Sequence, residues 1–213
     1  MTLQEHNKAS EWFDGLYAKH KDNFDNIPWA RLEVNPLLKS YLEEERKHKG
    51  KALVIGCGLG DDAKGIEEAG YDVVAIDVSQ TALDLAQQRF SDSSIVFEKQ
   101  DIFDMPQKYH HYFDFVFEAF TIQSLPVEFR QKMIKAVTNT LCEGGKILLV
   151  AHQRERLFPG PPWPLEAHEV EYFKTHGLKE ISHSIHKEES PISSTKFRVM
   201  YQKSPPDKHP KQL

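Results

Sequence analysis

Short apolar runs alternate with longer amphipathic segments between residues 51 and 151. Five runs rich in β-branched residues predict strands, at residues 52–55, 72–76, 95–98, 113–117 and 146–151. Three of them contain four consecutive apolar residues: Ala-Leu-Val-Ile, Val-Val-Ala-Ile and Ile-Leu-Leu-Val. Continuous apolar runs are typical of parallel strands whose two faces are both covered by helices. The pattern therefore predicts an α/β fold around a parallel sheet.

The amphipathic segments between these runs predict helices at residues 61–69, 79–90 and 126–141. Apolar residues recur at helical spacing in the third segment and predict its buried face: Phe129, Met133, Ile134, Val137 and Leu141. We expect the pair Gly144-Gly145 to mark the point where this helix stops.

Helices are also predicted before the first strand. Asn35 and Pro36 are suited to the N-cap and first position of a helix that runs to about Arg46, and residues 10–20 predict another helix. Together these segments would form a helical cover over residues 1–48.

The chain after the fifth strand carries a second, smaller set of elements. We expect a proline-rich turn at residues 158–164, a helix at 166–176, and an antiparallel strand pair at 178–185 and 195–202. The last segment, 204–213, is polar with three prolines, and we expect it to be disordered.

Three glycines, Gly56, Gly58 and Gly60, alternate directly after the first predicted strand and before a predicted helix. Glycine leaves no side chain where a ligand approaches the backbone, although glycines also mark simple turns. Asp77 ends the second strand seventeen residues beyond Gly60, where doubly wound nucleoside-binding sheets place a carboxylate on ribose hydroxyls. Asp77 alternatively caps the helix whose predicted N-cap is Ser79, and the two roles are compatible.

Two classes of cofactor use this geometry: dinucleotides and S-adenosylmethionine. A dinucleotide loop runs G-x-G-x-x-G and would need a glycine where this chain has Asp61. Asp61 and Asp62 also oppose an anionic pyrophosphate, whereas acidic residues stabilise the start of a helix by about 0.3 to 1 kcal/mol each. A sulfonium cofactor without phosphates therefore fits this loop better than NAD.

Asp101 and Ile102 follow the third predicted strand. At the carboxyl end of such a strand, a carboxylate is placed to accept a hydrogen bond from the adenine amino group, and Ile102 is placed to line an apolar wall for the ring. The alternatives are a solvated acid for Asp101 and core packing for Ile102.

With these residues in place, the chain resembles the class I S-adenosylmethionine-dependent methyltransferases, whose first four motifs are similar to residues 54–60, 75–77, 100–101 and 113–118. The resemblance implies a Rossmann-like, doubly wound seven-stranded sheet of order 3-2-1-4-5-7-6, with the last strand antiparallel and helices on both faces. It also implies methyl transfer from S-adenosylmethionine to a small molecule, with S-adenosylhomocysteine as the product. The residues expected at the cofactor are Gly56, Cys57, Gly58, Gly60, Asp77, Val78, Asp101, Ile102, Glu118 and Trp29.

Within this class the chain is most similar to the thiopurine methyltransferases and the plant-type thiol or halide methyltransferases. Pro28-Trp29 followed by residues 35–38 resembles their amino-terminal cover, and residues 113–130 resemble their fourth-strand region. Residues 160–164 resemble a turn before the helix that precedes their final hairpin. The resemblance implies a thiol or another soft nucleophile as methyl acceptor, methylated by in-line displacement.

The acceptor pocket is expected after the fourth and fifth strands and in the amino-terminal cover. Candidate acceptor-binding residues there are Trp12, Gln123, Arg154 and Trp163. Glu118 and His152 are the catalytic candidates, because Glu118 ends an apolar strand at the ligand edge and His152 follows the fifth strand, where a general base could stand. A capping or ion-pair role for Glu118 and a structural role for His152 are the alternatives. We expect Cys57 to pack under the cofactor and not to act as a nucleophile.

Composition and charge limit the number of domains and the kinds of binding partner that we expect. The 213 residues are 39% hydrophobic, enough for one core, and we expect a single domain over residues 1–203. The 27 basic residues are spread among 32 acidic ones, with a net charge of −5, and form no basic stripe for nucleic acid. The amino terminus has no apolar run typical of a secretory signal, and no stretch approaches about 18 apolar residues. We expect a cytoplasmic protein, a monomer or weak homodimer, that binds neither nucleic acid nor membrane.

The cysteines and histidines predict no metal site. Cys57 and Cys142 are too few for a cysteine-rich zinc site, and His183 and His186 would face opposite sides of a predicted strand. Three functions remain: a small-molecule methyltransferase, an NAD(P)-dependent oxidoreductase and a nucleoside-binding module without catalysis. Asp61 argues against the oxidoreductase.

Overall fold

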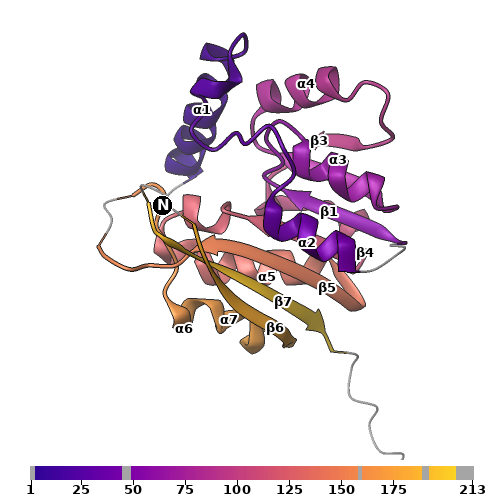
Figure 1. Cartoon of the computed structure of the whole chain (residues 1–213), viewed down its shortest axis with the longest axis vertical. Coiled ribbons are helices and arrows are strands. Elements are labelled where there is room, and N and C mark those ends of the chain that lie inside the picture. The colour runs from indigo at the N-terminus through magenta and orange to yellow at the C-terminus, as the bar shows by residue number, and fades with distance from the viewer. Residues whose placement is uncertain (1–2, 45–48, 158–159, 189–191, 205–213) are drawn as a thin grey trace, which may run out of the picture.

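The computed structural model describes residues 3–44, 49–157, 160–188 and 192–204 of the chain, with side chains from residue 11 onward. A seven-stranded sheet of order β3-β2-β1-β4-β5-β7-β6 forms its centre (Figure 1). The strands are β1 (Lys51–Ile55), β2 (Asp72–Asp77), β3 (Val96–Lys99), β4 (Phe113–Ala119), β5 (Leu141–His152), β6 (Leu178–Lys187) and β7 (Thr195–Lys203).

Strand direction follows the expected plan. The pairs β1–β2, β2–β3, β1–β4 and β4–β5 are parallel, and β7 runs antiparallel to both β5 and β6. The predicted fold class, strand order and antiparallel last strand are therefore confirmed. In this register Ile55 lies beside Ile76 on one side and Glu118 on the other, so the carboxyl ends of β1, β2 and β4 meet at one edge.

The described helices cover both faces of the sheet. The α-helices are α1 (Leu3–Lys19), α2 (Pro36–Glu44), α3 (Asp61–Glu68), α4 (Gln80–Arg89), α5 (Arg130–Thr140), α6 (Ala167–Val170) and α7 (Tyr172–Thr175). Short 3₁₀ helices are η1 (Phe24–Asn26), η2 (Ile102–Asp104), η3 (Gln107–Tyr109), η4 (Ile122–Ser124) and η5 (Val127–Phe129).

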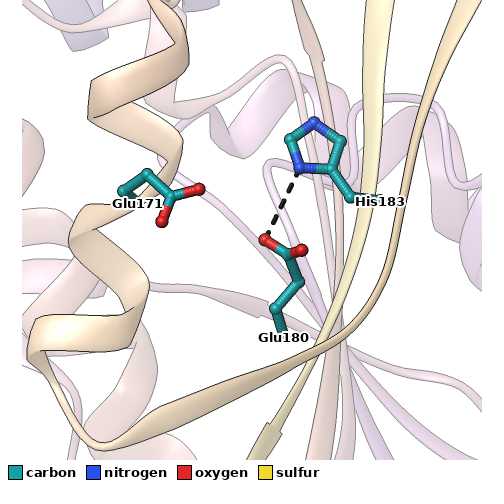
Figure 2. Close-up of side chains that lie close together, drawn as sticks. All are labelled: Glu171, Glu180 and His183. Atoms are coloured by element: carbon teal, nitrogen blue, oxygen red, sulfur yellow. Dashed lines mark ion pairs between the residues drawn. The ribbon is translucent and has the colours of Figure 1, made fainter.

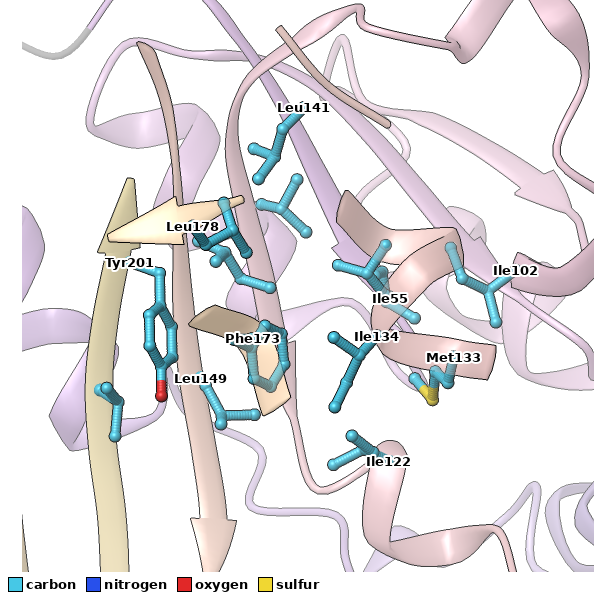
Figure 3. Packing of buried hydrophobic residues seen from close by; sticks show 14 of the residues in the cluster. Ile55, Ile102, Ile122, Met133, Ile134, Leu141, Leu149, Phe173, Leu178 and Tyr201 are labelled. Carbon is cyan, nitrogen blue, oxygen red and sulfur yellow. The ribbon is translucent and has the colours of Figure 1, made fainter. Parts of the chain in front are cut away.

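Two hydrophobic cores lie on opposite faces of the sheet. One packs Leu38 of α2, Ile66 of α3 and Leu83 of α4 against the sheet. The other packs Met133 of α5 and Phe173 of α7, among others, against the opposite face (Figure 3). Alternate positions of the central strands therefore serve two different cores, which explains why these strands contain uninterrupted apolar stretches such as residues 52–55 and 147–151.

The amino-terminal helices are tied to the start of α4. Asp14 of α1 accepts hydrogen bonds from the Ser79 hydroxyl (2.7 Å) and the Thr81 backbone N–H (2.9 Å). Ser79 is the N-cap of α4, as predicted, and its hydroxyl accepts from the Ala82 N–H. Asn35 likewise accepts from the Leu37 N–H at the start of α2. The capping chemistry predicted at these two helices is confirmed.

Some predicted boundaries are wrong. The helix expected at residues 126–141 begins only at Arg130, after a turn of 3₁₀ helix that contains Phe129, and it ends at Thr140. Gly144 and Gly145 do not stop it, because the chain has already entered β5, where Leu141 pairs with Phe113. The fifth strand is thus longer than the predicted 146–151, and its extra residues were mistaken for the end of a helix because Leu141 continued the apolar pattern.

The helix predicted at 166–176 is also divided. It forms two short helices, α6 and α7, with Glu171 between them. The predicted helix end near Arg46, part of the turn at 158–164 and nearly all of the tail at 204–213 lie outside the described residues. No helix in the described part of the chain is long and apolar enough to cross a membrane.

Candidate functional site

The glycine loop connects the end of β1 to α3. Gly56 and Gly58 have φ values of +63° and +51°, in the left-handed region that favours glycine. A Cβ atom on Gly56 would lie 2.4 Å from the Thr121 hydroxyl, and one on Gly58 would lie 2.8 Å from the Tyr17 hydroxyl. Both positions therefore require glycine for conformation and for space. Gly60 is the N-cap residue of α3.

Cys57 lies between these glycines and is buried. Its backbone N–H donates to the Ile76 carbonyl at 3.0 Å, which ties the loop to β2. Burial, reinforced by the nearby Asp77 carboxylate, raises the pKa of the Cys57 thiol well above its usual value. A protonated thiol is a poor nucleophile, so this environment favours the packing role expected for Cys57.

Asp77 joins the glycine loop to the start of α4. Its carboxylate accepts a hydrogen bond from the Gly58 N–H on one oxygen and from the Ser79 N–H on the other, both at 2.9 Å. Burial raises the pKa of Asp77, and the backbone hydrogen bonds oppose that rise. Each oxygen keeps a second lone pair after these contacts, so the carboxylate is oriented but still able to accept ligand hydroxyls. Val78, the next residue, is half-buried.

The loop after β3 lies beside Asp77, because the Gln100 N–H donates to the Asp77 carbonyl at 3.0 Å. Asp101 accepts from the Phe103 N–H at 2.9 Å and caps η2. Ile102 is buried in the core shared with α5. The structure thus places the Asp101 carboxylate at the expected edge and gives it a capping role there.

Glu118 is the buried acid at the end of β4. One carboxylate oxygen accepts from the Ile122 N–H at 2.8 Å, and the other is buried without a partner among the described residues. Burial raises the pKa of Glu118 to about 7. Because Glu118 pairs with Ile55, its unpartnered oxygen belongs to the edge where the glycine loop begins.

An aromatic cover from the amino-terminal segment lies over this edge. The Trp29 indole N–H donates to the Tyr17 hydroxyl at 2.7 Å. The rings of Trp12 and Phe13 lie 5.7 and 5.5 Å from that of Trp29. Trp12 is 51% exposed and Trp29 is 38% exposed, whereas Tyr17 is buried against the glycine loop. Trp12, expected at the acceptor, and Trp29, expected at the cofactor, therefore lie together in the amino-terminal segment.

The other candidate acceptor-binding residues take part in hydrogen bonds that position the segment after β5. Gln123 accepts from the His152 N–H at 2.7 Å, and its backbone carbonyl accepts from the Trp163 N–H at 2.6 Å. Arg154 donates to the Pro164 carbonyl (3.3 Å) and pairs with Glu166 (2.6 Å). The structure brings Gln123, His152 and Trp163 together.

His152 is buried between two residues that sequence reasoning missed, Phe120 and Lys196. The His152 and Phe120 rings lie 5.1 Å apart, and Lys196 is paired directly opposite His152 in β7. Burial, and secondarily Lys196, lowers the pKa of His152 to about 4. No local pattern marks Phe120 or Lys196, because the position of Phe120 depends on the pairing of β4 with β5 and that of Lys196 on the pairing of β5 with β7.

A buried ion pair, also missed, supports the same segment. Arg130 of α5 pairs with Glu169 of α6, and both side chains are almost completely buried. Arg130 also donates to the Trp163 carbonyl at 2.5 Å. The turn that carries Trp163 is thereby fixed to α5.

Glu171, Glu180 and His183 are the three potential metal ligands that the described residues bring together (Figure 2). The Lys174 ammonium lies 2.6 Å from the Glu171 carboxylate and 3.1 Å from that of Glu180. A lysine already supplies the positive charge that these carboxylates need, which gives the cluster a structural explanation.

An open cavity of about 290 Å³ lies between α3 and the loop after α4, lined by Lys64, Arg89, Phe90, Ser91, Asp92 and Ser93. None of the residues expected to bind cofactor or acceptor lines it. The candidate site is therefore not this cavity. It lies at the edge where the carboxyl ends of the parallel strands meet, here called the functional edge.

Comparison with known proteins decides the family. The family model for thiopurine S-methyltransferase matches residues 17–200. The chain belongs to the thiopurine S-methyltransferase family. It is 25% identical over 166 residues to thiocyanate methyltransferase 1 of Brassica oleracea, covering 76% of this chain and 68% of the relative. It is also 25% identical over 177 residues to thiopurine S-methyltransferase of Legionella pneumophila (strain Corby), covering 75% of each.

Solved structures share the fold of this methyltransferase. N-methyltransferase NodS from Bradyrhizobium japonicum WM9, in complex with S-adenosylhomocysteine, superposes with a TM-score of 0.71 at 18% identity, covering 89% of this chain and 99% of the other. Magnesium protoporphyrin IX methyltransferase from Synechocystis PCC 6803 gives 0.71 at 15% identity, covering 93% and 100%. The chain is thus an S-adenosylmethionine-dependent methyltransferase that acts on a small molecule, and the oxidoreductase and non-catalytic alternatives are not favoured.

The residues of this methyltransferase fit its cofactor. The glycine loop has no room for side chains at Gly56 and Gly58, and Glu118 has a buried carboxylate oxygen without a partner among the described residues. Asp61 is held by two hydrogen bonds from Arg89, at 2.6 and 2.8 Å, so its charge is balanced and does not oppose a pyrophosphate as expected. The absence of the third glycine at this position still disfavours a dinucleotide.

Proposed function

We propose that this methyltransferase transfers a methyl group to a thiol or another soft, polarisable nucleophile. The observation that carries the proposal is His152, the candidate base beside Gln123 and Trp163: with a pKa lowered to about 4, it is too weak a base to deprotonate a hydroxyl or an ammonium group near neutral pH. We assign Glu118, whose pKa is about 7, to the cofactor and not to the acceptor. A thiol needs little help from a base, because its own pKa lies near 8.5. The names of three relatives, a thiocyanate, a probable thiol and a thiopurine methyltransferase, agree with an acceptor that reacts through sulfur.

The cofactor would be held by the glycine loop and by the ends of β2, β3 and β4. The proposed binding residues are Gly56, Cys57, Gly58, Gly60, Asp77, Val78, Asp101, Ile102, Glu118 and Trp29. The backbone of the loop admits a close approach, Asp77 accepts hydrogen bonds from the ribose hydroxyls, and Asp101 accepts one from the adenine amino group. When bound, S-adenosylmethionine supplies a methyl group on a positively charged sulfur.

The protein contributes orientation and the exclusion of water. Well-oriented reactants gain about 7 to 11 kcal/mol of barrier lowering, so a direct in-line transfer needs no covalent protein intermediate. Trp12, together with the cover, would close the acceptor side, while Gln123, Arg154 and Trp163 shape it from the segment after β5. The hydrogen bonds of Gln123 and Arg154 to backbone groups support this indirect role.

We further propose that the enzyme works in the cytoplasm as a monomer or weak homodimer, without binding nucleic acid or membranes. The net charge of −5 and the mixed distribution of basic and acidic residues support this.

Calorimetry with S-adenosylmethionine, S-adenosylhomocysteine and NAD tests the cofactor, and methylation assays with matched thiol, hydroxyl and amine compounds test the acceptor. We expect the two adenosyl compounds to bind, NAD not to bind, and only the thiol to be methylated at a useful rate. Exclusive binding of NAD, or faster methylation of the amine or the hydroxyl, would contradict the proposal.

A further inference from the structure

Phe120 is held in a strained conformation at the functional edge. It directly follows β4 with φ of +63°, a left-handed value that a bulky residue rarely adopts. Its backbone N–H donates to the Val150 carbonyl of β5 at 2.9 Å, which fixes this conformation. Strained residues of this kind cluster at ligand sites, where the surrounding structure holds them in place.

This position adjoins the glycine loop. The next residue, Thr121, packs against Gly56 and donates its hydroxyl hydrogen to the Ile55 carbonyl at 3.2 Å. Phe120 is half-buried and directly precedes Thr121, so it lies close to the loop proposed to hold the cofactor. A group that lies against Phe120 is close to where the methyl group would be delivered.

Lys196 lies against this ring with a buried ammonium group. Its side chain is only 5% exposed, and Nζ lies 5.4 Å from the centroid of Phe120. Nζ donates to the Glu188 carboxylate at 2.5 Å. An ammonium carries three N–H groups, so this bond leaves donors for a second anion.

The charged groups around Lys196 come from three other elements. His152 of β5 faces it and is neutral near pH 7, because burial lowers its pKa to about 4. Glu188, at the end of the β6 hairpin arm, is 42% exposed and also pairs with Arg31 of the amino-terminal segment at 3.1 Å. Glu188 thus has a second cation available at the surface if it leaves Lys196.

We propose that Lys196 binds the methyl acceptor as a thiolate, taking the place of Glu188 at the ammonium, and is thereby a specificity-determining residue. This rests on the proposed function, which supplies a thiol acceptor, and adds how that thiol is ionised and held. A cation within about 4 to 6 Å stabilises the thiolate and lowers the pKa of the thiol by about 1 to 3 units.

The step balances without a protein base. The thiol proton passes to water, the thiolate sulfur forms the new bond to the methyl carbon, and the bond from that carbon to the sulfonium breaks with its electron pair left on the departing thioether. One negative and one positive charge cancel. His152 stays neutral throughout, in keeping with its low basicity.

The test measures ionisation of a bound thiol without turnover. Thiophenol, whose thiol and thiolate absorb differently, is titrated by ultraviolet spectroscopy in complex with the enzyme and S-adenosylhomocysteine. In the wild-type complex we expect the bound thiol to titrate about 1 to 3 pH units below free thiophenol. Lys196→Met should abolish this shift, Lys196→Arg should retain most of it, and Glu188→Gln should enlarge it by removing the competing carboxylate.

Lys187→Met is the matched control, because it removes a positive charge from an exposed position next to Glu188 and should leave the shift unchanged. Binding of S-adenosylhomocysteine within twofold of wild type shows that each variant is folded. If thiophenol titrates identically in the wild type and in Lys196→Met while both methylate it, this inference is wrong and the proposed function stands. If the wild-type complex neither binds nor methylates thiols, the proposed function falls, and this inference with it.

Discussion

The two halves of the functional edge are built by different means. At the cofactor half, backbone N–H groups do most of the positioning: Gly58 and Ser79 hold Asp77, and Phe103 holds Asp101. At the acceptor half, side chains hold distant segments together: the Gln123 side chain accepts from the His152 backbone N–H, and Arg130 pairs with Glu169. The first half is fixed by residues close in sequence to the strands, and the second by tertiary packing. The acceptor half should therefore be more sensitive to remote substitutions.

The largest effect is expected at the ion pair beneath the acceptor half. Arg130→Met leaves Glu169 buried without its partner and should lower the free energy of unfolding by about 3 to 5 kcal/mol, measured by urea denaturation. Lys174→Met, which removes a lysine from exposed carboxylates, is the control and should change it by no more than about 1 kcal/mol. If the two variants lose equal free energy of unfolding, the buried Arg130–Glu169 pair contributes no more to stability than an exposed pair.

The next effect depends on pH and belongs to the cofactor half. Burial raises the pKa of Glu118 from 4.5 to about 7, so between these values the folded protein keeps a proton that the unfolded chain has released. Glu118 therefore makes the protein less stable as the pH rises from 5 to 8, by at most about 3 kcal/mol.

Glu118→Gln removes this titration. The unfolding free energy of the variant relative to wild type should rise steadily between pH 5 and pH 8, measured by urea denaturation at each pH. A difference that does not change with pH would show that Glu118 is ionised throughout this range.

Asp77→Ala probes the cofactor half directly. We expect S-adenosylhomocysteine to bind more than tenfold more weakly by calorimetry, because the ribose hydroxyls lose their charged acceptor and the Gly58 N–H loses its partner. Asp72→Ala, at the exposed start of the same strand, should leave the dissociation constant unchanged. If Asp77→Ala binds S-adenosylhomocysteine with unaltered affinity, Asp77 serves only as a helix cap.

Trp12→Ala should have the smallest effect on stability, and it should affect the acceptor half without affecting the cofactor half. Trp12 is half exposed, so the unfolding free energy should change by no more than about 0.5 kcal/mol. Loss of an aromatic contact worth about 0.5 to 1.5 kcal/mol should raise the acceptor KM about two- to tenfold. Affinity for S-adenosylhomocysteine should stay within twofold, and a matched loss there would place Trp12 in the cofactor half instead.

The difference between local contacts and tertiary packing also explains which features could be predicted from the sequence. The strands, the glycine loop, Asp77 and the N-cap Ser79 depend on local pattern, and the structure has all of them in place. Phe120 depends on how β4 pairs with β5, Lys196 depends on how β5 pairs with β7, and the Arg130–Glu169 pair joins helices almost forty residues apart. Gly144 shows another limit: it has the left-handed φ of +77° that is typical of a residue after a helix, yet it lies in an irregular stretch of β5 between the pairings of Leu141 and Lys146.

The bonds of Asp14 give the amino-terminal helix a further significance. Ser79 and Thr81 lie only a few residues beyond Asp77, and Tyr17, one turn after Asp14, stands over Gly58. Removal of the first twenty residues would remove two hydrogen bonds from the start of α4 and uncover the glycine loop in one step. The amino-terminal helix is thus a wall over the glycine loop that we propose binds the cofactor, and a shortened chain that keeps the whole sheet would lack this wall.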